Sequence, residues 1–164
     1  NLLVRGIEAE VVPACLEYGM GIIAWSPLAG GWLTGKYQRD VPPTGHTRLG
    51  ENPERGMEGW AKRNANQQTW DILAELRRVA DELGVTMAQA ALAWVADRPA
   101  VTAPILGARS MEQLQDVMGA AELHLPDELM ARLDDVSDPQ FADYPYGRPG
   151  QDQRDRPIPG GRAS

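Results

Sequence analysis

Cysteine, excess basic charge and long apolar runs are all scarce in this chain of 164 residues. Cys15 is the only cysteine, which excludes an internal disulfide and fits a reducing compartment. Lys and Arg number 16 against 23 Asp and Glu, a net charge of −7 that argues against a non-specific nucleic-acid binder, because phosphate contacts need clustered basic side chains. No apolar run approaches the roughly 18 residues that span a bilayer. We therefore expect a cytoplasmic protein with neither nucleic-acid nor membrane partners.

The chain begins Asn1-Leu2-Leu3-Val4, without a methionine and without a basic-then-apolar leader. Processing or trimming would explain this start, and the sharper hypothesis is that the chain begins inside a larger fold. Its length predicts one domain, and 43% hydrophobic residues suffice for a core. From residue 139 onward Pro, Gly, Asp and Arg dominate. We expect residues 1–138 to fold and residues 139–164 to form a disordered tail.

Hydrophobic periodicity and capping signals predict alternating helices and short strands. Helical spacing of apolar residues, stop signals at Gly19 and Gly84, and the capping patterns Thr86-x-x-Gln89 and Ser110-x-x-Gln113 set the helix limits. Short β-branched runs predict buried parallel strands. Residues 38–59 predict a long irregular loop of the kind that is usually functional. The expected helices are 7–18 (starting at or kinked by Pro13), 70–83, 86–98, 110–121 and 127–136, and the expected strands are 21–26 and 101–106.

This alternation is typical of an α/β unit with a parallel sheet. Only two full strands are predicted, with the end of a third at residues 1–4. Two parallel strands leave both sheet edges without hydrogen-bond partners. The sequence therefore predicts that strands from outside this chain complete the sheet.

The first predicted strand ends in a glycine-rich stretch from Trp25 to Lys36. Glycine removes the Cβ obstruction, so the backbone N–H groups of such a turn can approach a phosphate closely. A tight turn with a packed tryptophan is the structural alternative. Gly30-x-x-x-x-Gly35-Lys36 nearly fits a P-loop, but Tyr37 stands where Ser or Thr would hold magnesium, so we reject that interpretation.

The second predicted strand ends at Gly107, directly before a helix that starts with the capping Ser110. Unpaired N–H groups and the dipole at a helix N-terminus favour an anion, and the Arg109 guanidinium suits a phosphate. Gln113 and Asp116 are expected on nearby turns, within reach of a ribose or adenine. A merely capped helix start is the alternative for this stretch alone. Two such strand ends in one chain favour a ligand, because α/β folds bind ligands at the carboxyl ends of strands.

Other motifs are weak. His46 and His124 are far apart in sequence and have no Cys or carboxylate neighbours at metal-ligand spacing, so we expect no metal site. His124 is expected on the surface between helices. No Gly-x-Ser-x-Gly elbow is present, which argues against a serine hydrolase.

The longer motifs resemble those of the aldo-keto reductases, in particular the branch that includes the potassium channel β subunits and many bacterial oxidoreductases. The resemblance covers residues 1 to about 138 and implies a (β/α)₈ TIM barrel of about 250 residues, of which this chain would hold the end of strand 6 through strand 8 and the terminal helices. It is carried by the segments Ala24-Trp25-Ser26-Pro27-Leu28-Ala29-Gly30-Gly31, Leu33-Thr34-Gly35-Lys36-Tyr37, Asn66-Gln67-Gln68-Thr69-Trp70, Ala88-Gln89-Ala90-Ala91-Leu92-Ala93-Trp94 and Pro104-Ile105-Leu106-Gly107-Ala108-Arg109-Ser110.

The resemblance implies NADPH as the cofactor. Trp25 would stack on the nicotinamide and Lys36 would reach a phosphate or ribose, with Arg48 as a further loop contact. Asparagine is usual in the family where this chain has Val117, an apolar residue that cannot hydrogen-bond adenine. The implied pyrophosphate contacts are Ser26, Pro27, Leu28, Ala29 and Gly30, and the implied contacts to the adenosine 2′-phosphate end are Gly107, Arg109, Gln113 and Asp116.

In the family, hydride passes from the nicotinamide to a substrate carbonyl, with a tyrosine as general acid supported by lysine, histidine and aspartate. All four belong to strands before residue 1, so we assign no catalytic residue and expect the chain alone to be inactive. The expected partners are a small carbonyl substrate and a complementing N-terminal half or a second copy. The alternatives are a non-catalytic half-barrel that serves in binding or assembly, and a truncated product.

Overall fold

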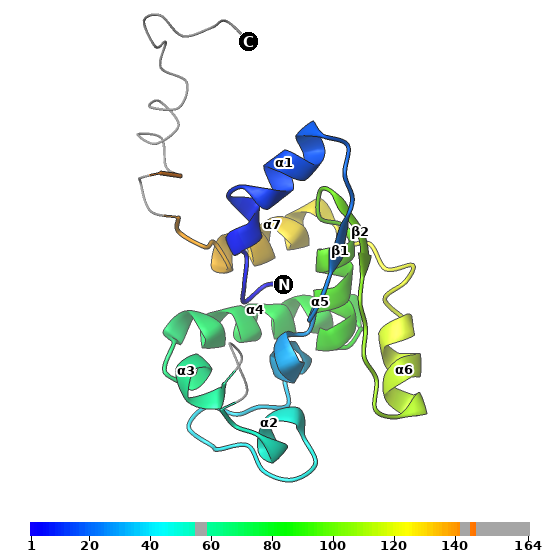
Figure 1. The fold of residues 1–164 in the computed structure, drawn as a ribbon. Helices are drawn as coiled ribbons and strands as arrows, with labels where there is room; N and C mark the ends of the chain where they lie inside the picture. Colours follow the sequence, from blue (N-terminus) through cyan, green and yellow to red (C-terminus); the bar gives the residue numbers. More distant parts are fainter. Residues whose placement is uncertain (55–58, 142–144, 147–164) are drawn as a thin grey trace, which may run out of the picture.

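The computed structural model describes residues 1–54, 59–141 and 145–146, and all statements below concern these residues. They form an α/β unit whose strands lie beside a group of packed helices (Figure 1). The elements in chain order are η1 (Gly6–Glu8), α1 (Val11–Glu17), β1 (Ile22–Ala24), η2 (Ala29–Thr34), α2 (Arg48–Glu51), α3 (Trp60–Asn64), α4 (Gln67–Leu83), α5 (Met87–Ala96), β2 (Val101–Pro104), α6 (Met111–Met118) and α7 (Asp127–Val136).

The two strands pair in parallel, with Ile22 opposite Val101 and Ala24 opposite Pro104. A register irregularity separates Ile22 from Ile23. Strand β2 packs on α5, whereas Ile23 keeps 64% of its surface exposed. Because parallel strands run in the same direction, their carboxyl ends meet at one edge of the sheet.

The helix limits follow the capping residues that the sequence supplies. Thr86 forms a full capping box with Gln89: its hydroxyl accepts from the Gln89 amide, and the Gln89 side chain accepts from the Thr86 amide. Gly84 ends α4 in the left-handed conformation, with φ at 66°. The predicted limits of α7 are confirmed at both ends. Helix α4 starts three residues earlier than predicted, because the Asn66 side chain accepts from the Gln68 amide and caps it there.

The main core lies between η2, α4, α5 and α7. Trp32 is fully buried and contacts Trp70 edge-on at 5.7 Å between ring centroids. A second, smaller cluster joins α6 to α5 through Val117, Ala120, Ala88 and Leu92. The turns that follow β1 and β2 are therefore each attached to the helical core, through Trp32 on one side and Val117 on the other.

Two local predictions are corrected. Residues 1–4 form a turn, with the Val4 amide donating to the Asn1 carbonyl at 2.9 Å, and not the end of a strand. The Asn1 side-chain amide instead donates to the Ser26 carbonyl at 3.0 Å, which ties this segment to the turn after β1. The predicted helix 7–18 is divided into η1 and α1, with Pro13 as the third residue of α1, where a missing N–H costs no helical hydrogen bond.

The long loop is more ordered than predicted. It contains α2, and its far end enters α3 at Trp60. Thr47 caps α2 by accepting from the Gly50 amide, and Leu49 is fully buried. Most of the predicted tail falls outside the described residues, except 139–141 and 145–146.

A charged cluster ties the N-terminal segment to α5 and α7. The Asp134 carboxylate accepts from Arg98 at 2.7 and 2.8 Å and from the Trp94 indole N–H at 3.1 Å. Arg5 lies 3.5 Å from the same carboxylate and also pairs with Glu8 at 2.7 Å. The guanidinium carbons of Arg5 and Arg98 lie 5.3 and 4.8 Å from the Trp94 ring centroid. Residues distant in sequence thus hold the sheet and helices in one arrangement.

Candidate functional site

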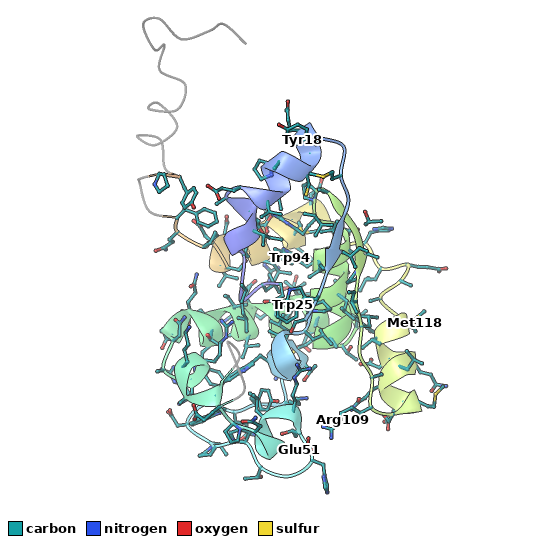
Figure 2. The ribbon with its side chains drawn as sticks, in the orientation of Figure 1. Tyr18, Trp25, Glu51, Trp94, Arg109 and Met118 are labelled. Atoms are coloured by element: carbon teal, nitrogen blue, oxygen red, sulfur yellow. The ribbon has the colours of Figure 1, made fainter. Side chains whose placement is uncertain are left out.

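The turns after β1 and β2 lie side by side, as predicted. The Ile105 amide donates to the Ala24 carbonyl at 2.7 Å, directly beyond the last paired residues of the sheet. Figure 2 shows Trp25 near the end of β1 and Arg109 beside Glu51, between α2 and α6. One edge of the sheet therefore carries both glycine-containing turns that the sequence singled out.

The turn after β1 has an unusual backbone. Ser26 and Ala29 have φ values of 52° and 47°, in the left-handed region that side chains with a Cβ rarely adopt. Gly30 and Gly31 follow with φ at 64° and 95°. Non-glycine residues in this region cost of order 1–3 kcal/mol each and are concentrated at ligand sites. The Trp25 side chain beside this turn is 69% exposed, which leaves its ring available to a flat ligand.

Lys36 folds back over this turn. A Cβ added at Gly31 would meet the end of the Lys36 side chain, and the φ of 95° favours glycine there. The Tyr37 hydroxyl donates to the Gly30 carbonyl at 3.2 Å and fixes the loop from below. Partial burial lowers the pKa of Lys36, and repulsion from Arg109 and Arg48 lowers it further. Three basic side chains from three different segments therefore gather at this edge.

The turn after β2 is shaped by Gln113. Its side-chain oxygen accepts from the Arg109 backbone amide at 2.9 Å, while the Gln113 backbone amide donates to the Ser110 hydroxyl at 3.2 Å. Ser110 therefore caps α6 as predicted, and only the return bond to the Gln113 side chain is shifted by one residue, to the Arg109 amide. A Cβ added at Gly107 would meet nothing within 4 Å. The space beside Gly107 is open, as close approach by a ligand requires.

Arg109 reaches across to the long loop. Its Nη2 donates to the Glu51 carboxylate at 2.6 Å, and its Nη1 donates to the His46 carbonyl at 3.2 Å. Glu51 is a site residue that the sequence did not reveal. No local signal could have revealed it, because the contact joins residues 58 positions apart.

Asp116 and Val117 face α5. The Asp116 carboxylate accepts from the Thr86 hydroxyl at 3.4 Å, and its backbone carbonyl accepts from the Gln89 side chain at 2.8 Å. Val117 is buried against Ala88. An apolar residue at position 117 therefore packs α6 onto α5, and the expected role of Asp116 toward adenosine stays a prediction.

Most of the predicted site residues thus lie at or beside the turns after β1 and β2, where the Ile105 amide bonds the Ala24 carbonyl. Arg48 and Arg109 lie close enough to Lys36 to lower its pKa. His124 lies elsewhere, exposed as predicted and 2.8 Å from Asp97. Within the described ranges, no group of three or more His, Cys, Asp or Glu could hold a metal ion. No helix among these residues is long and apolar enough to cross a membrane.

Comparison with curated proteins finds oxidoreductases and channel subunits. The chain is 38% identical over 136 residues to the uncharacterized oxidoreductase YrpG of Bacillus subtilis, covering 83% of this chain and 38% of that protein. It is also 38% identical over 117 residues to a probable voltage-gated potassium channel subunit beta of Arabidopsis thaliana, covering 71% of this chain and 34% of that one. The chain thus spans little more than a third of the length of these relatives.

Among solved structures, a glycerol dehydrogenase of Gluconobacter oxydans superposes with a TM-score of 0.65 at 25% identity, covering 87% of this chain and 44% of that one. The family model described as "Aldo/keto reductase family" matches residues 1–138. The sequence motifs, the adjacent strand-end turns and these matches agree: the chain belongs to the aldo/keto reductase family, whose members here are oxidoreductases and channel β subunits.

Proposed function

We propose that this chain is the NADPH-binding part of an oxidoreductase that reduces aldehydes or ketones to alcohols, folded as the C-terminal portion of a TIM barrel. The observation that carries the proposal is the pairing of β1 with β2, which brings two glycine-containing turns and three basic side chains to one edge. Ligands of parallel α/β folds bind at the carboxyl ends of strands, which is this edge.

The residues present fit a phosphorylated dinucleotide. Left-handed backbone at Ser26, Ala29, Gly30 and Gly31 gives a tight turn, and a Cβ at Gly107 would meet nothing within 4 Å. Such turns expose N–H groups to phosphate oxygens. The exposed Trp25 ring offers a stacking surface for a flat ligand. A pyrophosphate at the first turn and a phosphate at the second would each face basic side chains.

Each residue has a proposed role toward the cofactor. Trp25 orients the nicotinamide ring, and Lys36 and Arg48 supply positive charge toward the phosphates. Arg109 binds the adenosine 2′-phosphate, since its planar fork suits a phosphate, and Gln113 holds the Arg109 backbone in place. When bound, NADPH supplies the hydride that reduces a carbonyl carbon. The turn from Ser26 to Gly30 lines the pyrophosphate, with Gly107 and Asp116 toward the adenosine.

The proton donor for the carbonyl oxygen is proposed to come from outside this chain. We therefore propose that the chain alone is inactive and that a complementing N-terminal half supplies the rest of the site. Self-association with a second copy is the alternative way to cover the sheet. The exposed face of β1 supports such a partner, because Ile23 is 64% exposed and an apolar sheet face is normally covered. A small carbonyl compound is the proposed substrate.

The test is NADPH binding by isothermal titration calorimetry, with NADH as the comparison. Arg109→Ala removes a charge-assisted contact of about 1.5–3 kcal/mol, so we expect NADPH to bind at least about tenfold more weakly and NADH to bind almost unchanged. Lys62→Ala is the control, because Lys62 is an exposed cation on α3, away from the strand ends. Equal weakening of both nucleotides, or no binding by the unmodified chain, would contradict the proposal.

A further inference from the structure

The guanidinium of Arg109 already forms an ion pair with an acidic side chain of the protein itself. The Glu51 carboxylate lies 2.6 Å from Arg109 Nη2, and the same carboxylate oxygen lies 3.9 Å from His46 Nδ1 (Figure 2). The two partners are 54% and 48% exposed, so solvent and incoming solutes reach the pair. A phosphate that binds Arg109 through Nη2 therefore competes with the Glu51 carboxylate for the same donor.

Helix α2 holds Glu51 in this position. Glu51 is the last residue of α2, and its amide donates to the Thr47 carbonyl at 3.0 Å. Leu49, two residues earlier, is fully buried and its amide donates to the Tyr37 hydroxyl at 3.4 Å. Because the helix is anchored, the carboxylate is presented to Arg109 at a high effective concentration.

The surrounding charges discriminate between anions. Arg48 and Arg109 both repel the Lys36 ammonium and lower its pKa, and an anion that enters beside Lys36 relieves this repulsion. A carboxylate contributes one negative charge, whereas a phosphate monoester carries about 1.5 to 2 at neutral pH and offers three acceptor oxygens. A phosphate monoester at the 2′ position can therefore displace Glu51, whereas a nucleotide without a 2′-phosphate leaves the ion pair in place.

We propose that Glu51 is a specificity-determining residue, an internal anion that pairs with Arg109 until the 2′-phosphate monoester of a nucleotide displaces it. This inference rests on the proposed function, because it assigns the 2′-phosphate to Arg109. Glu51 thereby lowers the affinity for every ligand that engages Arg109 and leaves the affinity for the other ligands unchanged. The residue sets how much of the binding depends on the 2′-phosphate.

The experiment compares 2′,5′-ADP with 5′-AMP, which has the same 5′-phosphate and lacks the 2′-phosphate, by titration calorimetry on the full chain and on Glu51→Gln. Glutamine keeps the shape of the side chain and removes its charge. Exposed ion pairs contribute about 0.2–1 kcal/mol, so removing the competitor should tighten 2′,5′-ADP binding by roughly 1.4- to fivefold and leave 5′-AMP unchanged. The gain should shrink in about 1 M salt, where charges are screened beyond about 3 Å.

Glu122→Gln is the matched control, since Glu122 is an exposed carboxylate beyond the end of α6 and the variant has the same net charge as Glu51→Gln. Equal tightening in both variants would assign the effect to net charge and overturn the inference. Unchanged or weaker 2′,5′-ADP binding in Glu51→Gln would also overturn it, while the proposed function stands if Arg109→Ala still weakens that ligand. If the unmodified chain binds neither nucleotide, the proposed function and the inference both fail.

Discussion

Asp134 joins three segments of the chain, and its removal should destabilise the protein strongly. The Asp134→Ala substitution leaves Arg98 without its two shortest contacts and the Trp94 indole N–H without an acceptor. The Arg5 side chain, only 8% exposed, keeps Glu8 and loses its second carboxylate. Two guanidinium groups then share one acidic partner, because Arg98 also reaches Glu8, at 3.3 Å.

The size of the effect follows from this geometry. Removing one partner of a buried ion pair costs about 3–5 kcal/mol. Because the Asp134 side chain is 32% exposed, water replaces part of the lost interaction, and we expect a loss of about 2–3 kcal/mol in the free energy of unfolding. For a chain of this size that corresponds to a fall of roughly 4–12 °C in Tm. Asp134→Asn retains one acceptor oxygen and should lose about half as much.

The assay is urea unfolding followed by circular dichroism, together with a thermal scan. Asp135→Ala is the control, because Asp135 is the next residue of α7 and is exposed. The two aspartates differ only in the direction in which their side chains leave the helix. The control should change the unfolding free energy by less than about 0.5 kcal/mol. The reasoning is refuted if the Asp134→Ala and Asp135→Ala variants unfold at the same urea concentration with the same slope.

Two further predictions concern acid stability and catalysis. Burial raises the pKa of Glu75, but hydrogen bonds from Arg78 and Arg132, each at 2.7 Å, outweigh it, and the net pKa is lowered. A lowered pKa stabilises the folded state above the unfolded-state value near 4.5, and this stability is lost as pH falls through the folded-state pKa. Unfolding free energy measured in urea should therefore drop less between pH 5 and about 3 in Glu75→Gln than in the unmodified chain; parallel pH profiles would contradict this. The chain should not oxidise NADPH in the presence of an aldehyde, as followed by NADPH absorbance, and turnover that Trp25→Ala abolishes would prove the opposite.

The sequence predicted the helical elements best, because their signals are local. Gly84 ends α4 and Thr86 caps α5, and the capping hydrogen bonds of each join residues only a few positions apart in the chain. Helix α7 agrees at both limits because its apolar spacing and its flanking Pro126 act locally. The strands were predicted in the right places but too long, since only residues that actually pair are counted in β1 and β2.

Contacts between distant segments could not be predicted. The turn at residues 1–4 depends on the hydrogen bond from Asn1 to Ser26, and the order of the long loop depends on burial of Leu49. The basic part of the site was found because Lys36 and Arg109 follow strand ends. Its acidic part, Glu51, was missed because an exposed glutamate in a loop resembles any solvated charge.

The uneven exposure of the tryptophans gives the protein an optical signal of its own. Trp32 and Trp94 are 0% and 2% exposed, whereas Trp25 is 69% exposed at the strand end. Emission at the red edge of the spectrum, and collisional quenching by acrylamide, should therefore arise mainly from Trp25. A ligand that covers the Trp25 indole would shield it from the quencher, while the quenching of the buried indoles would not change. Occupancy of the strand-end turn can therefore be followed without a label.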